Sequence, residues 1–356
     1  MEILLSEGEE PCCLPPSQPV VLAIGIFDGV HRGHQRVLSH TITGARSLGG
    51  IAAVYTFFPY PSSVVEGLAP KALILPKEVK YARIAALGMD VLIEQRFDQT
   101  FSQLSGEQFL SLLRKKIPTL RGLCVGEDFC FGRGRSSDST TLGLLAKKRG
   151  IETQILPSLC SPDEQRISST RVRRSISAAR MELTRELLGR PYEMEGKWQG
   201  RGKASAVPSA ELLLDWEPEL RLRSGLYYVR YRNRSLERSI PRAEEGLLVY
   251  PPPNPLRPGR CCRLYPLREA GFSPGDAIRL HCLHYSGDFS EDPEEGPEES
   301  LCGREQELAR DYFLKKFPHG SGDFSEDPEE GPAGSLCGRE QELARDYFLK
   351  KFPHGD

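Results

Sequence analysis

The stretch Gly25-Ile26-Phe27-Asp28-Gly29-Val30-His31-Arg32-Gly33-His34 decides the fold of this chain. It follows the apolar run Val20–Ile24 and precedes a helical pattern over residues 33–48. Glycines after a first strand let the backbone approach a phosphate, and the start of the next helix offers free amides and a positive dipole. Two imidazoles at this turn could donate to one anion and neutralise charge that develops at phosphorus. We predict a phosphate-binding turn; the alternative is an accidental pair of histidines in a Gly-rich loop.

Short apolar runs alternate with helical stretches over residues 20–185. The predicted strands are 20–24, 51–58, 91–94, 122–125 and 152–156, and the predicted helices lie near 33–48, 78–87, 105–116, 140–149 and 169–188. This alternation favours an α/β fold with a parallel sheet covered by helices on both faces. Residues 190–285 are rich in Gly, Pro, Tyr and Val, with candidate strands at 225–231, 246–250 and 277–281, which fits a small β-barrel.

A tandem repeat ends the chain, because residues 286–320 recur at 321–355 with two differences. Each copy is predicted to be an acidic linker followed by one amphipathic helix, and two copies are too few for a solenoid. The predicted organisation is an N-terminal tail (1–18), an α/β domain (19–187), a β-barrel (188–285) and the two repeats (286–356). One barrel offers one groove, so only the first helix is expected to dock on it. The second is expected to be mobile unless it meets a protein partner or swaps onto a neighbouring chain.

The composition, 39% hydrophobic and 27% charged, is that of a globular protein and excludes disordered or collagenous chains. No apolar run is long enough to span a membrane, and the ten cysteines are interpreted as reduced thiols, so we predict a cytoplasmic location. Residues 286–356 contain 8 Lys and Arg against 19 Asp and Glu, and the rest contains 39 against 30. This basic body favours small phosphorylated ligands over nucleic acid, because no basic stripe interleaved with aromatics occurs.

The opening stretch resembles the H-x-G-H signature of nucleotidyltransferases with a Rossmann-like α/β fold. Three later segments are similar to the bacterial FAD synthetases, which are usually fused to riboflavin kinase. Residues 55–61 (Y-T-F-F-P-Y-P) resemble T-F-x-P-H-P, residues 125–132 (V-G-E-D-F-C-F-G) resemble V-G-x-D-F-x-F-G, and residues 167–173 (I-S-S-T-R-V-R) resemble I-S-S-T-x-I-R. Tyr60 stands where the family pattern has His.

The resemblance implies adenylyl transfer, in which the FMN phosphate attacks the α-phosphate of ATP and releases pyrophosphate. His31 and His34 would stabilise the α-phosphate, while Arg171 and Ser168 would hold the β- and γ-phosphates. Further ATP contacts are expected from Gly25, Phe27, Asp28, Gly29, Gly33, Ser169 and Thr170. Flavin contacts are expected from Phe57, Pro59, Tyr60, Pro61, Asp128, Phe129 and Phe131, with plain core packing as the alternative for these aromatic rings. Mg²⁺ is expected to be bound mainly by the ATP phosphates rather than by a protein metal site.

The segment 188–192 (L-G-R-P-Y) and the later Gly225-Leu226-Tyr227 resemble the riboflavin kinase module. Where that module has P-T-A-N, this chain has Pro208-Ser209-Ala210-Glu211, and the segment with the catalytic Glu has no counterpart. We therefore expect a degenerate kinase site beside an FMN adenylyltransferase. The alternatives are a bifunctional enzyme, another H-x-G-H transferase acting on pantetheine phosphate, nicotinamide mononucleotide or a glycerol phosphate, and a non-catalytic flavin-binding scaffold.

Overall fold

A computed structural model describes residues 1–8, 10–65, 72–201, 210–214, 220, 222–233, 244–250, 261–266, 273 and 275–287. The chain forms two compact units, one beginning at Met1 and ending at Ser169 and the other beginning at Thr170. The predicted domain boundary, after residue 187, lies further along the chain. Apart from residues 286 and 287, the tandem repeats lie outside the described residues, as do their predicted helices and their predicted partner or swap.

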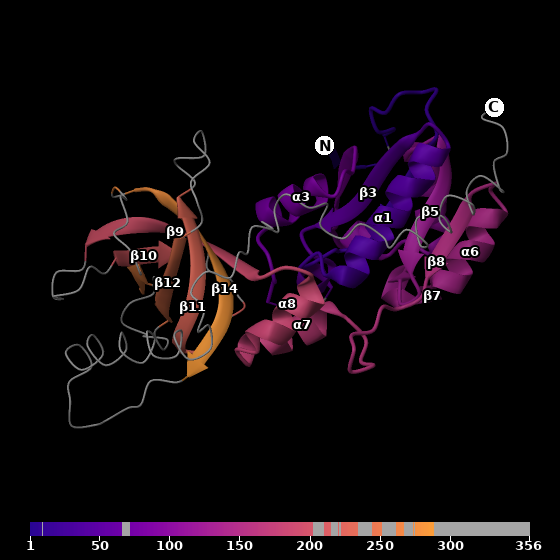
Figure 1. Cartoon of the computed structure of the whole chain (residues 1–356). Coiled ribbons are helices and arrows are strands. Elements are labelled where there is room, and N and C mark those ends of the chain that lie inside the picture. The colour runs from indigo at the N-terminus through magenta and orange to yellow at the C-terminus, as the bar shows by residue number, and fades with distance from the viewer. Residues whose placement is uncertain are drawn as a thin grey trace. The chain divides into compact units, whose positions relative to one another are not determined.

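The first unit is built on a six-stranded sheet whose named pairs are all parallel, as predicted (Figure 1). In sheet order its strands are β1 (Glu2–Ser6), β4 (Val91–Arg96), β3 (Ile51–Phe58), β2 (Val20–Ile24), β5 (Leu120–Gly126) and β8 (Glu152–Leu156). The edge strand β1 was not predicted, because residues 2–6 were assigned to the N-terminal tail. It pairs with β4 from Glu2 opposite Val91 to Ser6 opposite Gln95.

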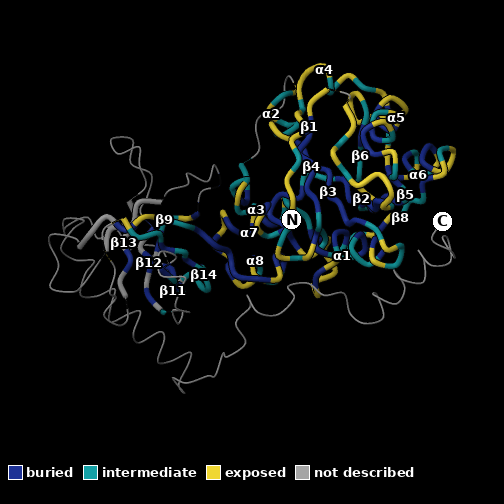
Figure 2. Tube along the Cα trace, turned by 90° about the horizontal axis from the view of Figure 1, so that it is seen from above, coloured by how far each residue is buried: buried dark blue, intermediate teal, exposed yellow. Residues whose placement is uncertain are grey.

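Helices cover both faces of this sheet, which gives the first unit its Rossmann-like α/β architecture. Helix α1 (Arg32–Ser47) packs on β2, β3 and β5, whereas α5 (Gly106–Lys116) and α6 (Ser139–Lys147) share a hydrophobic core with alternate residues of the strands. Strand β2 is buried on both sides, and Figure 2 shows the central strands as the most buried part of the unit. This is the arrangement in which a continuous apolar run such as 20–24 is stable as a strand.

The remaining elements of the first unit are short or lie at its edges. They are α2 (Pro61–Val64), α3 (Lys77–Ala86), α4 (Gln99–Ser102), the strand pair β6 (Cys130–Phe131) and β7 (Ser137–Asp138), and a 3₁₀ turn at Arg133–Arg135. Helix α5 begins with a capping box, in which the Ser105 hydroxyl accepts the Gln108 amide and the Gln108 side chain accepts the Ser105 amide. Such reciprocal caps satisfy amides that a helix start leaves without partners.

The second unit contains α7 (Ser169–Ser177), of which Ser169 belongs to the first unit, α8 (Met181–Leu188) and a closed antiparallel barrel. The single helix predicted over 169–188 is divided, because Ala179 takes a positive φ of 54°. The barrel order is β10 (Ala210–Leu214), β13 (Cys261–Pro266), β12 (Glu244–Tyr250), β11 (Gly225–Asn233), β14 (Ala277–Gly287) and β9 (Tyr192–Arg201). The three predicted strands correspond to β11, β12 and β14. No helix among the described residues is long and apolar enough to cross a membrane.

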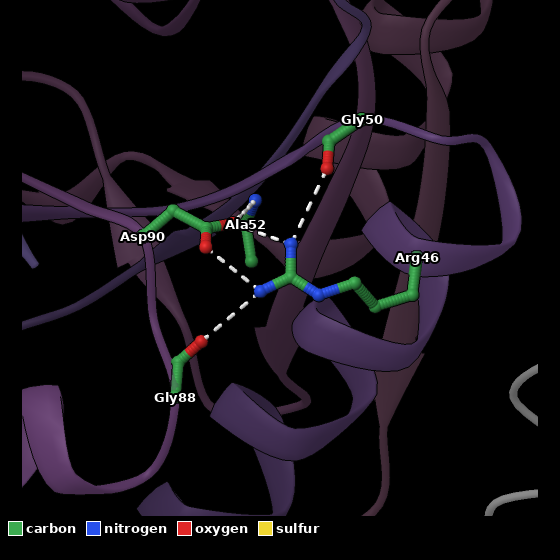
Figure 3. A network of polar contacts seen from close by, with 5 residues as sticks. All are labelled: Arg46, Gly50, Ala52, Gly88 and Asp90. Atoms are coloured by element: carbon green, nitrogen blue, oxygen red, sulfur yellow. Dashed lines mark hydrogen bonds and ion pairs between the residues drawn. The ribbon is translucent and has the colours of Figure 1, made fainter.

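A polar clamp joins α1 to the starts of β3 and β4 (Figure 3). The Arg46 guanidinium donates to both carboxylate oxygens of Asp90, at 2.6 and 2.7 Å, and to the carbonyls of Gly50 and Gly88, each at 3.4 Å. The Ala52 amide donates to the same carboxylate at 2.8 Å. The Arg46 hydrogen bonds hold the pKa of Asp90 below its ordinary value, and the amide contributes in the same direction. Asp90 therefore stabilises the fold in its charged form.

We expect Asp90→Ala to lower the free energy of unfolding at pH 7 by about 1–2 kcal/mol, because the Ala52 amide loses its acceptor and a partly exposed ion pair is lost. Since the folded pKa of Asp90 lies below the unfolded value, the stabilisation is present above the unfolded pKa and is lost as the pH falls below about 4. Urea titrations of variant and wild type at pH 7 and pH 3 measure the free energy of unfolding. A loss in Asp90→Ala that is as large at pH 3 as at pH 7 would contradict the prediction.

Candidate functional site

The predicted phosphate-binding stretch forms a tight turn between β2 and α1. Gly29 has a φ of +83°, as a glycine can adopt freely, but Phe27 and Val30 also take positive values of +54° and +43°. A positive φ is unusual for a bulky side chain and a genuine outlier for a β-branched residue such as valine. Such strain persists only where the surroundings impose it, and it collects at functional sites.

Contacts from several segments hold this turn in place. The Val30 amide donates to the Phe27 carbonyl at 3.1 Å, and the Gln35 side-chain amide donates to the Val30 carbonyl at 2.8 Å. The Asp28 carboxylate is buried and accepts the Ile74 amide, with oxygen distances of 3.0 and 3.2 Å. The turn is therefore fixed by its own backbone, by α1 and by the segment that precedes α3.

The two histidines of the H-x-G-H motif lie together at the start of α1. His31 is the N-cap residue, and its Nδ1 accepts the backbone amide of His34 at 3.3 Å. The imidazole rings stack with their centroids 3.6 Å apart and an interplanar angle of 18°, and Phe27 meets the His34 ring edge-on at 5.3 Å. Because Nδ1 of His31 is an acceptor, a neutral His31 ring carries its proton on Nε2. The pair thus combines imidazole donors with the positive end of a helix dipole.

Close packing around the histidines explains why small residues surround them. A Cβ atom on Gly33 would lie 3.2 Å from the His31 ring and 3.9 Å from the Ile167 carbonyl. A Cβ atom on Gly25 would lie 3.1 Å from the Phe27 ring. These two glycines therefore allow the rings their present positions.

The motif at residues 167–173 lies partly against the same turn. The Ser169 hydroxyl donates to the Asp28 carbonyl at 3.0 Å, and the neighbouring Ser168 is partly buried. Thr170 and Arg171 follow in the first turn of α7 and belong to the second unit. Ser169 thus contacts the turn, whereas the ATP contacts of Ser168, Thr170 and Arg171 stay predictions.

The aromatic residues predicted to contact flavin divide into two groups. The Phe57 and Phe131 side chains are 8% and 7% exposed and belong to the hydrophobic core of the first unit. Phe57 packs on Tyr55 and Phe97, so the alternative of core packing describes its environment. By contrast, Phe129 is partly buried and stacks on Phe131 with centroids 5.6 Å apart.

The other segment of that group is more accessible. Pro59 is exposed, and Tyr60 and Pro61, at the start of α2, are partly buried. The adjacent Phe58 is 40% exposed, with the Lys77 ammonium 4.3 Å from the centre of its ring. The segment from Phe58 to Pro61 is therefore accessible to a ligand, and its role in flavin binding stays a prediction.

Two charged residues near these segments were missed by the sequence analysis. Arg166 forms an ion pair with the exposed Asp128, one of the residues predicted to contact flavin. Lys80, on α3, is 1% exposed and donates to the Ile26 carbonyl at 3.1 Å and to the Thr56 hydroxyl at 3.4 Å. Desolvation lowers the pKa of Lys80 to about 8, although the Asp28 carboxylate opposes the shift. The sequence does contain a sign of this burial. In the predicted helix over 78–87, Lys80 lies on the same apolar face as Tyr81 and Ile84.

The parallel sheet and the histidine turn at the end of its β2 strand define a nucleotidyltransferase of Rossmann-like fold. The family model of FAD synthetase matches residues 14–171. A putative bifunctional riboflavin kinase/FMN adenylyltransferase from Geobacillus thermodenitrificans is 35% identical over 185 residues, which cover 52% of this chain and 96% of that protein. The chain belongs to the FAD synthetase family.

Two further comparisons extend this result. The bifunctional riboflavin kinase/FMN adenylyltransferase of Listeria monocytogenes is 32% identical over 216 residues, covering 60% of this chain and 68% of that protein. A crystal structure described as a macrolide-efflux protein from Streptococcus pneumoniae matches with a TM-score of 0.72 at 18% identity, covering 89% of this chain and 99% of that one. At this identity the likeness concerns the fold alone.

Proposed function

We propose that this protein is an FMN adenylyltransferase that transfers AMP from ATP to FMN, giving FAD and pyrophosphate. The observation that carries the proposal is the stacked pair of His31 and His34 at the start of α1, on a turn with two non-glycine residues at positive φ. Family membership supports the same reaction. A non-catalytic scaffold would have no need for this arrangement.

In the proposed reaction an oxygen of the FMN phosphate forms a bond to the α-phosphorus of ATP, and the bond between that phosphorus and the pyrophosphate oxygen breaks. Negative charge moves toward the oxygens of the α-phosphate and the leaving group. His31, donating from Nε2, and His34 stabilise this charge, and the free amides of the first turn of α1 act in the same direction. Because the donors are fixed beforehand, little reorganisation is needed in the transition state.

The remaining predicted contacts complete the proposal. Ser168 and Arg171 bind the β- and γ-phosphates, and the segment around Tyr60 receives the flavin ring. The described residues contain no group of three or more His, Cys, Asp and Glu side chains that could hold a metal ion, and the Asp28 carboxylate accepts the Ile74 amide. We propose that Mg²⁺ would be bound mainly by the ATP phosphates and would supply positive charge opposite the pyrophosphate leaving group.

Incubation of the full chain with FMN, ATP and Mg²⁺, followed by chromatographic separation of the flavins, tests this function. We expect FAD and an equal amount of pyrophosphate. Parallel reactions that replace FMN with pantetheine phosphate, nicotinamide mononucleotide or glycerol 3-phosphate test the other H-x-G-H transferases. No FAD from a folded protein would refute the proposal, and product in only one of the other reactions would assign that substrate instead.

For the barrel we propose a riboflavin-kinase-like fold that lacks kinase activity. Its closed six-stranded topology supports the fold, while Glu211 stands where the related module has Asn. A carboxylate at that position would repel ATP phosphates. Pro208 and Ser209 lie outside the described residues, and Glu211 lies on β10.

We therefore expect riboflavin with ATP and Mg²⁺ to give neither FMN nor FAD above the background of a reaction without enzyme, because any FMN that formed would be carried on to FAD. The measurement is the same flavin separation, with FMN plus ATP as the positive reaction of the same preparation. Steady production of FMN or FAD from riboflavin would make the protein bifunctional and would require another carboxylate, such as Glu244, to act as the base.

The cytoplasmic location, the absence of nucleic-acid partners and the domain limits also stay predictions.

A further inference from the structure

Lys80 links two segments of the candidate site through contacts that the proposed reaction does not use. Its ammonium group donates to the Ile26 carbonyl and the Thr56 hydroxyl, and that hydroxyl itself donates to the Ile26 carbonyl at 3.4 Å. Ile26 opens the strained turn, and Thr56 lies on β3 just before the segment proposed to receive flavin. Three polar groups therefore form a triangle between the nucleotide turn and the flavin segment.

We propose that the Lys80 ammonium group is a positioning group that holds the turn from Ile26 to Val30 in its catalytic conformation. This inference rests on the proposed adenylyl transfer and adds to it a residue that does not touch the reacting atoms. Two non-glycine residues of this turn take positive φ, and such a conformation needs external contacts to persist. A charged donor makes a stronger hydrogen bond to a carbonyl than a neutral donor does. Lys80 is therefore suited to fixing the turn at its first carbonyl.

The burial of Lys80 argues for a functional rather than a stabilising role. Its folded pKa, about 8, lies below the ordinary value for lysine. The unfolded chain therefore binds the proton more tightly, and at pH 7 the fold is less stable with Lys80 protonated than it would be with Lys80 neutral. The difference in stability disappears as the pH rises from the folded pKa of Lys80 to its unfolded pKa, because the ammonium group then loses its proton in both states. Buried groups with shifted pKa values that destabilise the fold collect at functional sites.

The charged and titratable surroundings of Lys80 come from several elements. Two carboxylates attract its ammonium group, one lysine repels it, and two tyrosine rings lie within 4.9 and 5.3 Å of it. These groups are Asp28 on the turn, Glu94 on β4, Lys77 on α3, Tyr60 beside α2 and Tyr81 on α3. Glu94 is already bound by Lys77, at 2.9 Å, and by the Tyr81 hydroxyl. Of the two lysines in this cluster, Lys77 pairs with Glu94, whereas Lys80 donates to the carbonyl of Ile26 at the start of the turn.

The test compares wild type, Lys80→Met and Lys80→Arg in single-turnover FAD synthesis between pH 6 and pH 10. We expect Lys80→Met to lower the rate about 10- to 100-fold at pH 7, as small misplacements of catalytic groups do, with the Kd values for ATP and FMN changed less than about threefold. The wild-type rate should fall as the pH rises through about 8, and this decline should be absent in Lys80→Met. Arginine keeps its charge, so Lys80→Arg should exceed Lys80→Met in rate and show no decline up to pH 10.

Lys116→Met is the matched control, because Lys116 is also fully buried but bonds to Ser6 and the Glu7 carbonyl. Hydrogen exchange gives a readout that does not depend on activity: peptides covering residues 25–35 should exchange faster in Lys80→Met and not in Lys116→Met. Circular dichroism should show that Lys80→Met and Lys116→Met are both folded at the temperature of the assay.

Three results would overturn the inference. They are a rate within threefold of wild type in Lys80→Met, an alkaline decline that persists in this variant, and unchanged hydrogen exchange of the turn. If wild type makes no FAD, the proposed function fails, and the exchange measurement still decides whether Lys80 holds the turn.

Discussion

Replacing His34 with alanine should lower turnover about 10²- to 10³-fold, the usual loss when one preorganised donor to transition-state charge is removed. The substitution removes the ring on which His31 stacks, but the hydrogen bond to His31 Nδ1 comes from the backbone amide of residue 34 and survives it. The FMN and ATP affinities should change less than turnover, since the donor acts mainly on charge that develops during transfer. His31→Ala should give a loss of the same size. The measurement is kcat and KM for both substrates.

His40→Gln provides the control for this prediction. His40 lies on the same helix, is buried, and follows the N-terminal turn in which His31 and His34, the proposed catalytic residues, lie. We expect its variant to lose stability while kcat per folded molecule stays within threefold of wild type. Full activity in a folded His34→Ala protein would remove the H-x-G-H motif from the mechanism.

Gly50→Ala should destabilise the first unit by about 3 kcal/mol, which is roughly 150-fold in the folding equilibrium. A Cβ atom at Gly50 would lie 2.1 Å from the Pro19 carbonyl oxygen and 2.9 Å from Pro19 Cγ. That carbonyl accepts the Ile51 amide at 2.8 Å, beside the start of the β2–β3 pairing. Relief of the clash therefore requires the two central strands to separate locally. Denaturant titration with a spectroscopic probe measures the loss.

The adjacent Gly49 is the matched control for this substitution. It has a φ of +62° and nothing within 4 Å of its would-be Cβ atom. Gly49→Ala should therefore lose only the backbone preference of glycine, about 1 kcal/mol. If both variants lost the same free energy of unfolding, the clash with Pro19 would have no measurable cost and the prediction would be wrong.

The central strands were predictable because they are buried on both faces. Three predicted strands have the same first and last residues as the observed ones: 20–24 for β2, 51–58 for β3 and 152–156 for β8. Strand β1 was missed because Glu2 and Ser6 flank only three apolar residues, and its pairing with β4 depends on residues far along the chain. The break between α7 and α8 was missed because Ala179 is a good helix former that takes a positive φ.

The proximity of His31 and His34 in the candidate site was predictable, because their chemistry and spacing coincide. The site was not predictable where tertiary packing decides the role of a residue. Phe57 and Phe131 could equally have lined a pocket or a core, and the fold buries both. Lys80 gave the opposite problem, because lysine is almost always exposed and a sequence does not reveal when one is buried.

The position of β1 also has a consequence for how the chain folds during synthesis. A ribosome makes β1 before β2 and β3, yet among the described strands β1 pairs with β4 alone, which is made after them. The nascent β1 therefore waits, with its backbone N–H and C=O groups unpaired and Leu4 not yet packed on the core, until β4 leaves the exit tunnel and joins the sheet. The strands β2 and β3 have nearer partners and can associate earlier. Slow translation between residues 58 and 91 would thus lengthen the time for which an unpaired strand is open to other chains.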